Sequence, residues 1–155
     1  MKKGVDFCSR ANLFRHRFTR RTLSRRQRVP FQFSEFKREN PNSNENNLQI
    51  EARRLQRASV VLAVLSTPIE HPKIPKWEMV LSSGAVCMNL LSCAQSLGYA
   101  AQWLTEWYAY NNKMLEYLGG RPNIDQISGF IYLGHKLEEP MERRRPEPSK
   151  VISYL

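Results

Sequence analysis

The pattern of hydrophobic and polar positions predicts a helix and then a strand in the middle of the chain. Leu48, Ala52, Leu55 and Ala58 recur at intervals of three or four residues, which places them on one face of a short amphipathic helix. The next run, residues 59–66 (SVVLAVLS), is apolar without polar alternation, as expected for a strand that is covered on both faces. We therefore expect this strand at the centre of a sheet.

A long apolar segment follows a proline-rich loop. Residues 78–97 are apolar on nearly all sides, so they predict a helix of roughly 30 Å that is buried in a core or in a dimer interface. Gly98 suits the C-terminal cap of this helix. Its two cysteines, Cys87 and Cys93, are predicted to be small buried hydrophobic residues.

The remaining pattern predicts two more strands with a short helix between them. The strands are expected at residues 99–105 and 126–134, and Asn111 or Asn112 can cap the helix, which two glycines at 119–120 end. This order of elements predicts an α+β fold with helices packed on a small mixed or antiparallel sheet. Three strands are a thin core for this much helix, which implies a missing piece or a partner chain.

Charge separates the first part of the chain from the rest. Residues 1–58 hold 15 of the 24 Lys and Arg but five of the 14 Asp and Glu, so they carry the whole net charge of +10. Residues 1–30 show no sustained period and are predicted to be disordered. The polar cluster 39–47 (ENPNSNENN) indicates a loop, and folded structure is expected to begin just after it. We divide the chain into a basic segment, residues 1–35, and a folded domain, residues 36–155.

Three explanations of the basic segment remain open. We favour a misread or frameshifted stretch joined to a truncated domain, because charge and periodicity change abruptly near residue 36. An Arg-rich, nearly acid-free composition is also typical of a mitochondrial transit peptide. A third explanation is an arm that attracts nucleic acid without sequence preference, although nucleic acid is not the partner that we expect.

The rest of the composition excludes several kinds of site. Three cysteines without a CxxC pair and three widely separated histidines predict no disulfide framework and no metal site. The most apolar stretch, residues 79–97, is interrupted by Ser, Asn and Gln, so we expect neither a membrane span nor a signal peptide. The cysteine usage fits a reducing compartment, and a cytoplasmic location is expected.

Four ordered peptides carry a resemblance to a known family. They are His71-Pro-Lys-Ile-Pro-Lys-Trp-Glu78, Ser83-Gly-Ala-Val-Cys-Met-Asn-Leu90, Gly98-Tyr-Ala-Ala-Gln-Trp-Leu-Thr105 and Ile127-Ser-Gly-Phe-Ile-Tyr-Leu-Gly134. In this order and at these separations they closely resemble the compact branch of the FMN-dependent nitroreductases, over about residues 36–155. The resemblance implies an α+β homodimer with FMN at its interface. There the flavin would take hydride from NAD(P)H and reduce nitroaromatics, quinones or related small acceptors.

The resemblance also implies cofactor-binding residues. Trp103, Leu104 and Thr105 match the segment whose backbone runs beside the flavin ring, where free N–H and C=O groups can bind the ring edge. Arg145 resembles a late basic residue near the flavin phosphate, and a guanidinium suits bidentate phosphate binding. The end of the long helix matches the region near which the nicotinamide nucleotide lies in relatives: Cys93, Ala94, Gln95, Ser96, Leu97 and Gly98.

The N-terminal part departs from the family pattern. Relatives begin with an Arg-Arg-Ser-like motif that holds the FMN phosphate, and a Pro-Asp-His-Gly-like loop and a Trp-containing strand follow it. None of these is recognisable here, and we treat the similarity of Thr19-Arg-Arg-Thr22 to the first motif as coincidence because no apolar helical face surrounds it. We therefore expect a nitroreductase-like fold that is truncated at its N-terminus. The alternative function is a non-catalytic remnant or interaction module with a basic N-terminal arm.

Overall fold

The computed structural model of the chain describes residues 25–139 and 141–154, with side chains from residue 31 onward. Its three strands, β1 (Val60–Ser66), β2 (Tyr99–Leu104) and β3 (Gln126–His135), form one antiparallel sheet in the spatial order β1-β3-β2. All three strands begin and end within two residues of the positions that the sequence predicts.

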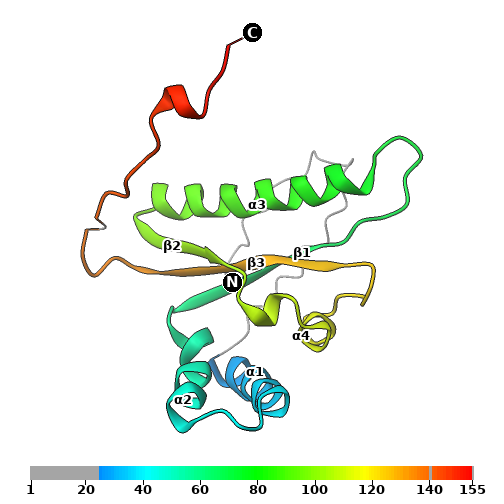
Figure 1. Cartoon of the computed structure of the whole chain (residues 1–155), viewed down its shortest axis with the longest axis vertical. Coiled ribbons are helices and arrows are strands. Elements are labelled where there is room, and N and C mark those ends of the chain that lie inside the picture. The colour runs from blue at the N-terminus through cyan, green and yellow to red at the C-terminus, as the bar shows by residue number, and fades with distance from the viewer. Residues whose placement is uncertain (1–24, 140, 155) are drawn as a thin grey trace, which may run out of the picture.

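Helices cover both faces of the sheet (Figure 1). The long helix α3 (Lys76–Ser96) crosses one face. The other face is covered by α1 (Arg25–Glu39), α2 (Glu45–Arg53), α4 (Asn112–Tyr117) and the short turns η1 (Arg54–Gln56) and η2 (Trp107–Ala109). A last turn, η3 (Pro148–Lys150), belongs to a tail that extends away from the layers. The predicted α+β architecture, with helices packed on a small antiparallel sheet, is confirmed.

Each face of the sheet has its own hydrophobic cluster, because successive side chains of a strand point to opposite faces. On the α3 face, Val64 and Ile131 pack with the buried Cys87 of the helix. Burial raises the pKa of the Cys87 thiol to about 11, so this thiol stays protonated. The larger cluster lies on the other face and includes Leu55, Val61, Leu65, Tyr108, Met114, Leu115, Leu118, Ile127, Phe130 and Tyr132.

The expectation that the first strand lies at the centre of the sheet is wrong, because β3 lies in the centre and β1 forms an edge. The apolar run of β1 has a different cause. Val61 and Leu65 face the large cluster while Val64 faces α3, so both faces of this edge strand are covered. The strand β1 therefore lacks alternating polar residues because helices cover both of its faces, not because it lies in the centre of the sheet.

The expectation that folded structure begins after residue 47 is also wrong, because helix α1 precedes the polar loop. Its side chains explain why it docks. Phe31 stacks on Tyr117 with ring centroids 4.5 Å apart, and Phe36 lies 5.6 Å from Trp107. The boundary that we place at residue 36 falls inside this helix. The disorder expected over residues 1–30 is wrong for residues 25–30, which belong to α1, and its remainder, residues 1–24, lies outside the described residues.

Helix α3 is less buried than its composition suggests. Its inner side packs on the sheet through Val86, Cys87 and Leu90, but Trp77 is 67% exposed and Met88 is 54% exposed. The same length and composition would also suit a membrane span, and cores of globular proteins contain such helices too. Because these side chains of α3 are exposed, the expectation that the helix is buried on nearly all sides is wrong for the described part of the chain.

The predicted helix ends are confirmed at three positions. Asn111 caps α4 by accepting a hydrogen bond from the Met114 backbone N–H at 2.9 Å. Gly98 and Gly119 follow α3 and α4 with φ of 81° and 85°, the left-handed conformation in which glycine commonly ends a helix.

Candidate functional site at the end of strand β2

Strand β2 forms the second edge of the sheet, and Trp103 anchors it on the face that α3 covers. The indole Nε1 of Trp103 donates to the backbone carbonyl of Ser128 at 3.0 Å. This carbonyl lies at a β-bulge, where the register between β1 and β3 shifts beside Val64 and Leu65. The Ser128 hydroxyl in turn lies 2.7 Å from that of Ser83 in α3. The bulge therefore links β2 to the helix above it.

Gly129 makes this placement of the indole ring possible. A Cβ atom at this residue would lie 2.0 Å from Nε1 of Trp103 and 3.2 Å from the backbone oxygen of Leu104. The glycine also has a φ of 156°. Any side chain at this position would displace the indole ring, so Gly129 and Trp103 fit together as a pair.

The turn after β2 contains an unusual backbone conformation. Glu106, directly after Thr105, has φ 58° and ψ 172°. A residue other than glycine in such a region costs about 1–3 kcal/mol, so surrounding contacts must hold it there. Those contacts come from Arg54, whose Nη1 donates to the Glu106 carboxylate at 2.6 Å.

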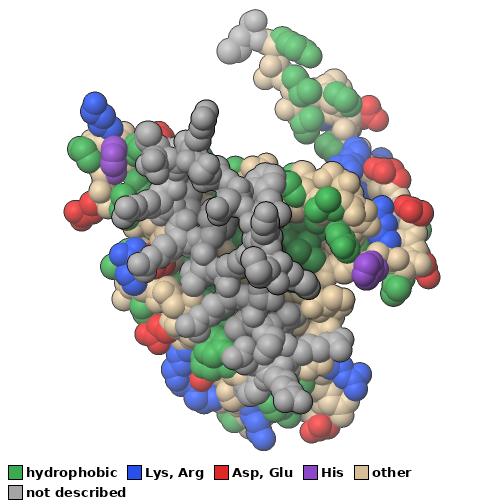
Figure 2. Space-filling model, turned by 180° about the vertical axis from the view of Figure 1, so that it is seen from behind, with side chains coloured by type: hydrophobic (Ala, Val, Ile, Leu, Met, Phe, Trp, Pro, Cys, Tyr) green, Lys and Arg blue, Asp and Glu red, His purple; other side chains and the backbone are tan. Residues whose placement is uncertain are grey.

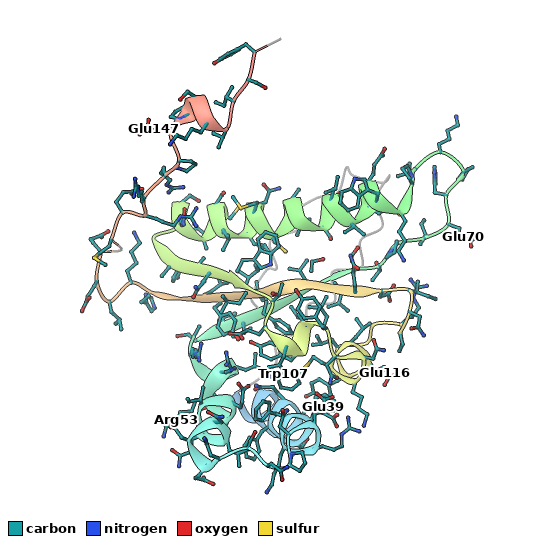
Figure 3. All side chains as sticks on the ribbon, viewed as in Figure 1. Glu39, Arg53, Glu70, Trp107, Glu116 and Glu147 are labelled. Carbon is teal, nitrogen blue, oxygen red and sulfur yellow. The ribbon has the colours of Figure 1, made fainter. Side chains whose placement is uncertain are left out.

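A buried carboxylate lies at the centre of these contacts. Glu51 of α2 is 4% exposed. It accepts hydrogen bonds from Arg54 Nε at 2.5 Å, from Trp107 Nε1 at 2.9 Å and from Gln32 Nε2 at 3.1 Å. Figure 3 shows Trp107 between the sheet and α1. Partial burial acts to lower the pKa of Arg54, but the bond to Glu51 and the charges of both glutamates raise it overall, so this guanidinium stays charged.

Two tyrosines continue the site beneath the sheet. The hydroxyls of Tyr108 and Tyr132 lie 2.7 Å apart in the large cluster. Burial raises the pKa of both, and for Tyr108 the hydrogen bond to its partner raises it further. Both phenols therefore stay neutral, and their role is to join η2 to the central strand.

The predicted nicotinamide region lies at the opposite end of β2. Cys93 to Ser96 form the last turn of α3, and Leu97 and Gly98 lead into the strand. Six residues of strand at ~3.3 Å each separate this turn from Leu104 by about 20 Å. Of the six predicted residues, Ala94 is buried and the others are exposed, so the burial expected for Cys93 is wrong.

Arg145 does not lie near the end of β2. It belongs to the exposed tail, where its Nε donates to Glu142 at 3.3 Å, and both side chains are more than two-thirds exposed. Figure 1 shows this tail extending beyond the end of α3, and Figure 2 shows its hydrophobic side chains standing clear of the body. The structure therefore brings Trp103, Leu104 and Thr105 together but leaves the other predicted residues apart.

One groove touches the predicted flavin strand. It has a volume of about 700 Å³ and is lined by Ala100, Ala101 and Gln102 together with Tyr132 and Arg57. Gln102 pairs with Tyr132, whereas Trp103 pairs with Ile131. The lining of this groove includes Gln102 and ends before Trp103, which packs with the Cys87 cluster on the α3 face. Another groove, of about 680 Å³, lies far along the sheet around His71, Lys76 and Arg121.

Comparison with known proteins decides the family. The Nitroreductase family model matches residues 15–135, more than half of the chain. The chain belongs to the nitroreductase family. The match includes Thr19-Arg-Arg-Thr22, which lies outside the described residues, and begins upstream of the boundary that we place at residue 36.

A curated member of this family shares part of its sequence with the chain. "Putative NAD(P)H nitroreductase YdjA" of Escherichia coli (strain K12) is 28% identical over 100 residues, which is 64% of this chain and 54% of the relative. The chain thus spans about half the length of the curated relative that it matches.

Solved nitroreductase structures share the fold. A nitroreductase-like family protein from Bacillus cereus superposes with a TM-score of 0.58 at 15% identity, covering 73% of this chain and 62% of that one. A "putative nitroreductase" from Desulfovibrio desulfuricans, solved in complex with FMN, has a TM-score of 0.54 at 21% identity, covering 67% of this chain and 59% of that one. At these identities the likeness shows the nitroreductase-like fold.

Sequence reasoning missed the residues that hold the β2 end in place. The spacing of Glu51 and Arg54 is a usable signal, because residues three apart on a helix are neighbours. Glu106 and Gln32 join the same network across long stretches of chain, and Gly129 meets Trp103 from another strand. No local pattern indicates such long-range contacts.

Proposed function

We propose that this chain acts in an FMN-dependent NAD(P)H oxidoreductase that reduces nitroaromatics, quinones or similar small acceptors. The observation that carries this proposal is the outer edge of β2. No other strand among residues 25–139 pairs with that edge, and a part-buried hydrogen bond from Trp103 to the Ser128 carbonyl anchors the strand on its inner side. Membership of the nitroreductase family supports the same reaction type.

The donor set at this edge suits the ring of FMN. A free strand edge presents N–H and C=O groups in alternation, and the edge of the isoalloxazine ring carries both acceptors and donors. When bound, FMN supplies the redox chemistry by accepting hydride from NAD(P)H and passing electrons to the acceptor. In this proposal Trp103, Leu104 and Thr105 hold the ring edge through their backbone.

The other predicted cofactor-binding residues lie apart from the end of β2. Arg145 would hold the FMN phosphate only if the tail lies against β2 in the loaded protein, because its present partner is Glu142. The α3 end, residues 93–98, would contact the nicotinamide nucleotide from the opposite end of β2. Both assignments follow from the resemblance to the family, and the fixed end of β2 is the part that this structure supports.

A homodimer is part of the proposal. The outer side of α3 exposes Trp77, Leu81 and Met88, and a second copy could cover this apolar surface. Size-exclusion chromatography with light scattering tests this pairing: the wild-type chain should elute as a dimer and Leu81→Lys as a monomer. Leu137→Lys, at a 96% exposed position outside α3, is the matched control and should remain dimeric. A monomeric wild-type chain would contradict the proposal.

The second candidate function is a non-catalytic interaction module. One observation favours it: Arg145 lies in the exposed tail and pairs with Glu142, apart from β2. Such a module would pair through α3 with an intact relative and would bind no flavin.

One experiment separates the two functions. FMN is added to the purified full chain, free flavin is removed by desalting, and the absorbance spectrum is recorded before NAD(P)H oxidation is measured with a nitroaromatic or a quinone. The reductase proposal predicts yellow protein that oxidises NAD(P)H over many turnovers when an acceptor is added, because the acceptor reoxidises the reduced flavin. Protein that stays colourless after FMN addition would contradict it and would favour the module.

A further inference from the structure

The turn that ends β2 is hydrogen-bonded to helical residues that lie about 50 positions earlier in the sequence. Glu106 and Trp107 are consecutive in this turn. Their side chains bind two residues that also bind each other: Glu51 of α2 and Arg54 of η1. Arg54 holds the carboxylate of Glu106 at 2.6 Å, and Glu51 accepts from the indole of Trp107 at 2.9 Å. The peptide between these two residues is therefore clamped from both sides.

The clamp is itself held rigidly. Arg54 donates to Glu51 at 2.5 Å, which closes a ring of contacts through the turn. Gln32 of α1 donates to the same carboxylate at 3.1 Å and is fully buried. Because Glu51 is also buried, loss of one partner leaves charged or polar groups without bonds in a place that water cannot easily reach.

The conformation of Glu106 indicates what the clamp does. Its φ of 58° lies in a region that residues other than glycine avoid, so the turn would relax without its two anchors. Relaxation would move the backbone of Thr105, the last residue of the segment assigned to the ring edge. Strain of this kind is retained where the surrounding structure over-determines it.

The geometry points to Glu51 and Arg54 as positioning residues that set the backbone of Thr105 and Glu106 for the ring edge of the flavin. This inference rests on the proposed function. Neither residue touches the ring; each acts through the turn that it holds. The chemistry that they position is a pair of backbone hydrogen-bonding groups, whose placement determines how tightly the ring edge is bound.

The test compares Arg54→Gln with Arg121→Gln in the full chain. Arg121 is a matched control because it also pairs with a buried carboxylate, that of Asp125 at 2.7 Å, but belongs to the loop before β3. Hydrogen exchange of amides 105–108 is measured without FMN, and FMN affinity is measured by flavin fluorescence. Loss of a charged hydrogen bond should speed exchange at these amides and weaken FMN binding in Arg54→Gln by about tenfold each. Arg121→Gln should change neither quantity.

A milder variant covers the case in which Arg54→Gln does not fold. Trp107→Phe removes the N–H that Glu51 accepts but keeps an aromatic ring, although a smaller one, against Phe36 and Tyr108. It should change both quantities in the same direction by about threefold. Exchange at amides 105–108 that matches wild type in both variants would overturn the positioning role. Equal loosening in Arg121→Gln would overturn it as well. A wild-type chain that binds no FMN would instead overturn the proposed function, and the exchange data would still decide whether the clamp holds the turn.

Discussion

The end of β2 and the C-terminal tail were both predicted to bind the flavin, and their settings differ sharply. Trp103 is fixed by a bond to the bulge at Ser128 and by close packing on Gly129. Arg145, in contrast, makes an ion pair three residues away in which both partners are exposed. The first region is thus preorganised within this chain, whereas the second needs another surface before it can contribute to a site.

The largest loss of stability is expected for Gly129→Ala, at the fixed end of β2. The new methyl group would overlap the Trp103 indole and crowd the Leu104 carbonyl, so we expect the free energy of unfolding to fall by about 3 kcal/mol. Urea denaturation measures this change. Gly134→Ala, in the same strand but with nothing within 4 Å of the added carbon, should cost less than about 1 kcal/mol. Equal costs at both positions would contradict the proposed fit between Gly129 and Trp103.

The next effect is expected for Trp103→Phe. Phenylalanine keeps an aromatic ring but loses the N–H that bonds to Ser128, so unfolding should become easier by about 1–2 kcal/mol. Tyr110→Phe, at a 78% exposed position outside α3, also removes one donor while keeping an aromatic ring; it is the control and should fall within about 0.5 kcal/mol of wild type. A similar loss in both variants would mean that Trp103 does not anchor the strand.

The stability that the Arg121–Asp125 pair contributes, at the far end of the sheet, is expected to depend on pH. Burial would raise the pKa of Asp125, but the three hydrogen bonds from Arg121 outweigh it and lower the pKa below its ordinary value of 3.8. A lowered folded pKa contributes stability above the unfolded pKa, and this stability is lost as the pH falls through the folded pKa. Wild type should therefore exceed Asp125→Asn in melting temperature at neutral pH, and the gap should narrow below about pH 4. A gap that stays constant across this range would contradict the assignment.

The smallest effect belongs to the tail. Removing the charge of Glu142 by Glu142→Gln should change the free energy of unfolding by less than about 0.5 kcal/mol, because exposed ion pairs contribute little. Thermal denaturation at low salt provides the measurement. A loss near that of Trp103→Phe would show that the tail is held by contacts much stronger than this pair.

The sequence predicts the elements well because their signals are local. The apolar run of residues 60–66, the asparagine cap at 111 and the glycine after α3 all depend on neighbouring residues. The order of the strands does not follow from such signals, and neither does the docking of α1. Phe31 and Phe36 lie in a strongly basic segment, and their partners Tyr117 and Trp107 are more than 70 residues away.

The candidate site shows the same limit. Trp103, Leu104 and Thr105 could be assigned to the flavin ring from sequence because they lie in one contiguous peptide, and this assignment stays a prediction. The groups that hold them in place come from α1, α2, η1 and β3, and each is an ordinary residue type at its own position. Arg145 was recognised by residue type, but contacts within this chain do not bring it to β2.

An amide titration of isotope-labelled protein with FMN, followed by nuclear magnetic resonance, tests the central claim most directly. If the end of β2 forms one wall of the flavin site, the amides of Trp103, Leu104, Thr105 and Glu106 should show the largest shifts. The amides around the groove at His71 and Arg121 should stay unchanged. Bound FMN with the largest shifts at that distant groove, and none at the end of β2, would contradict the account.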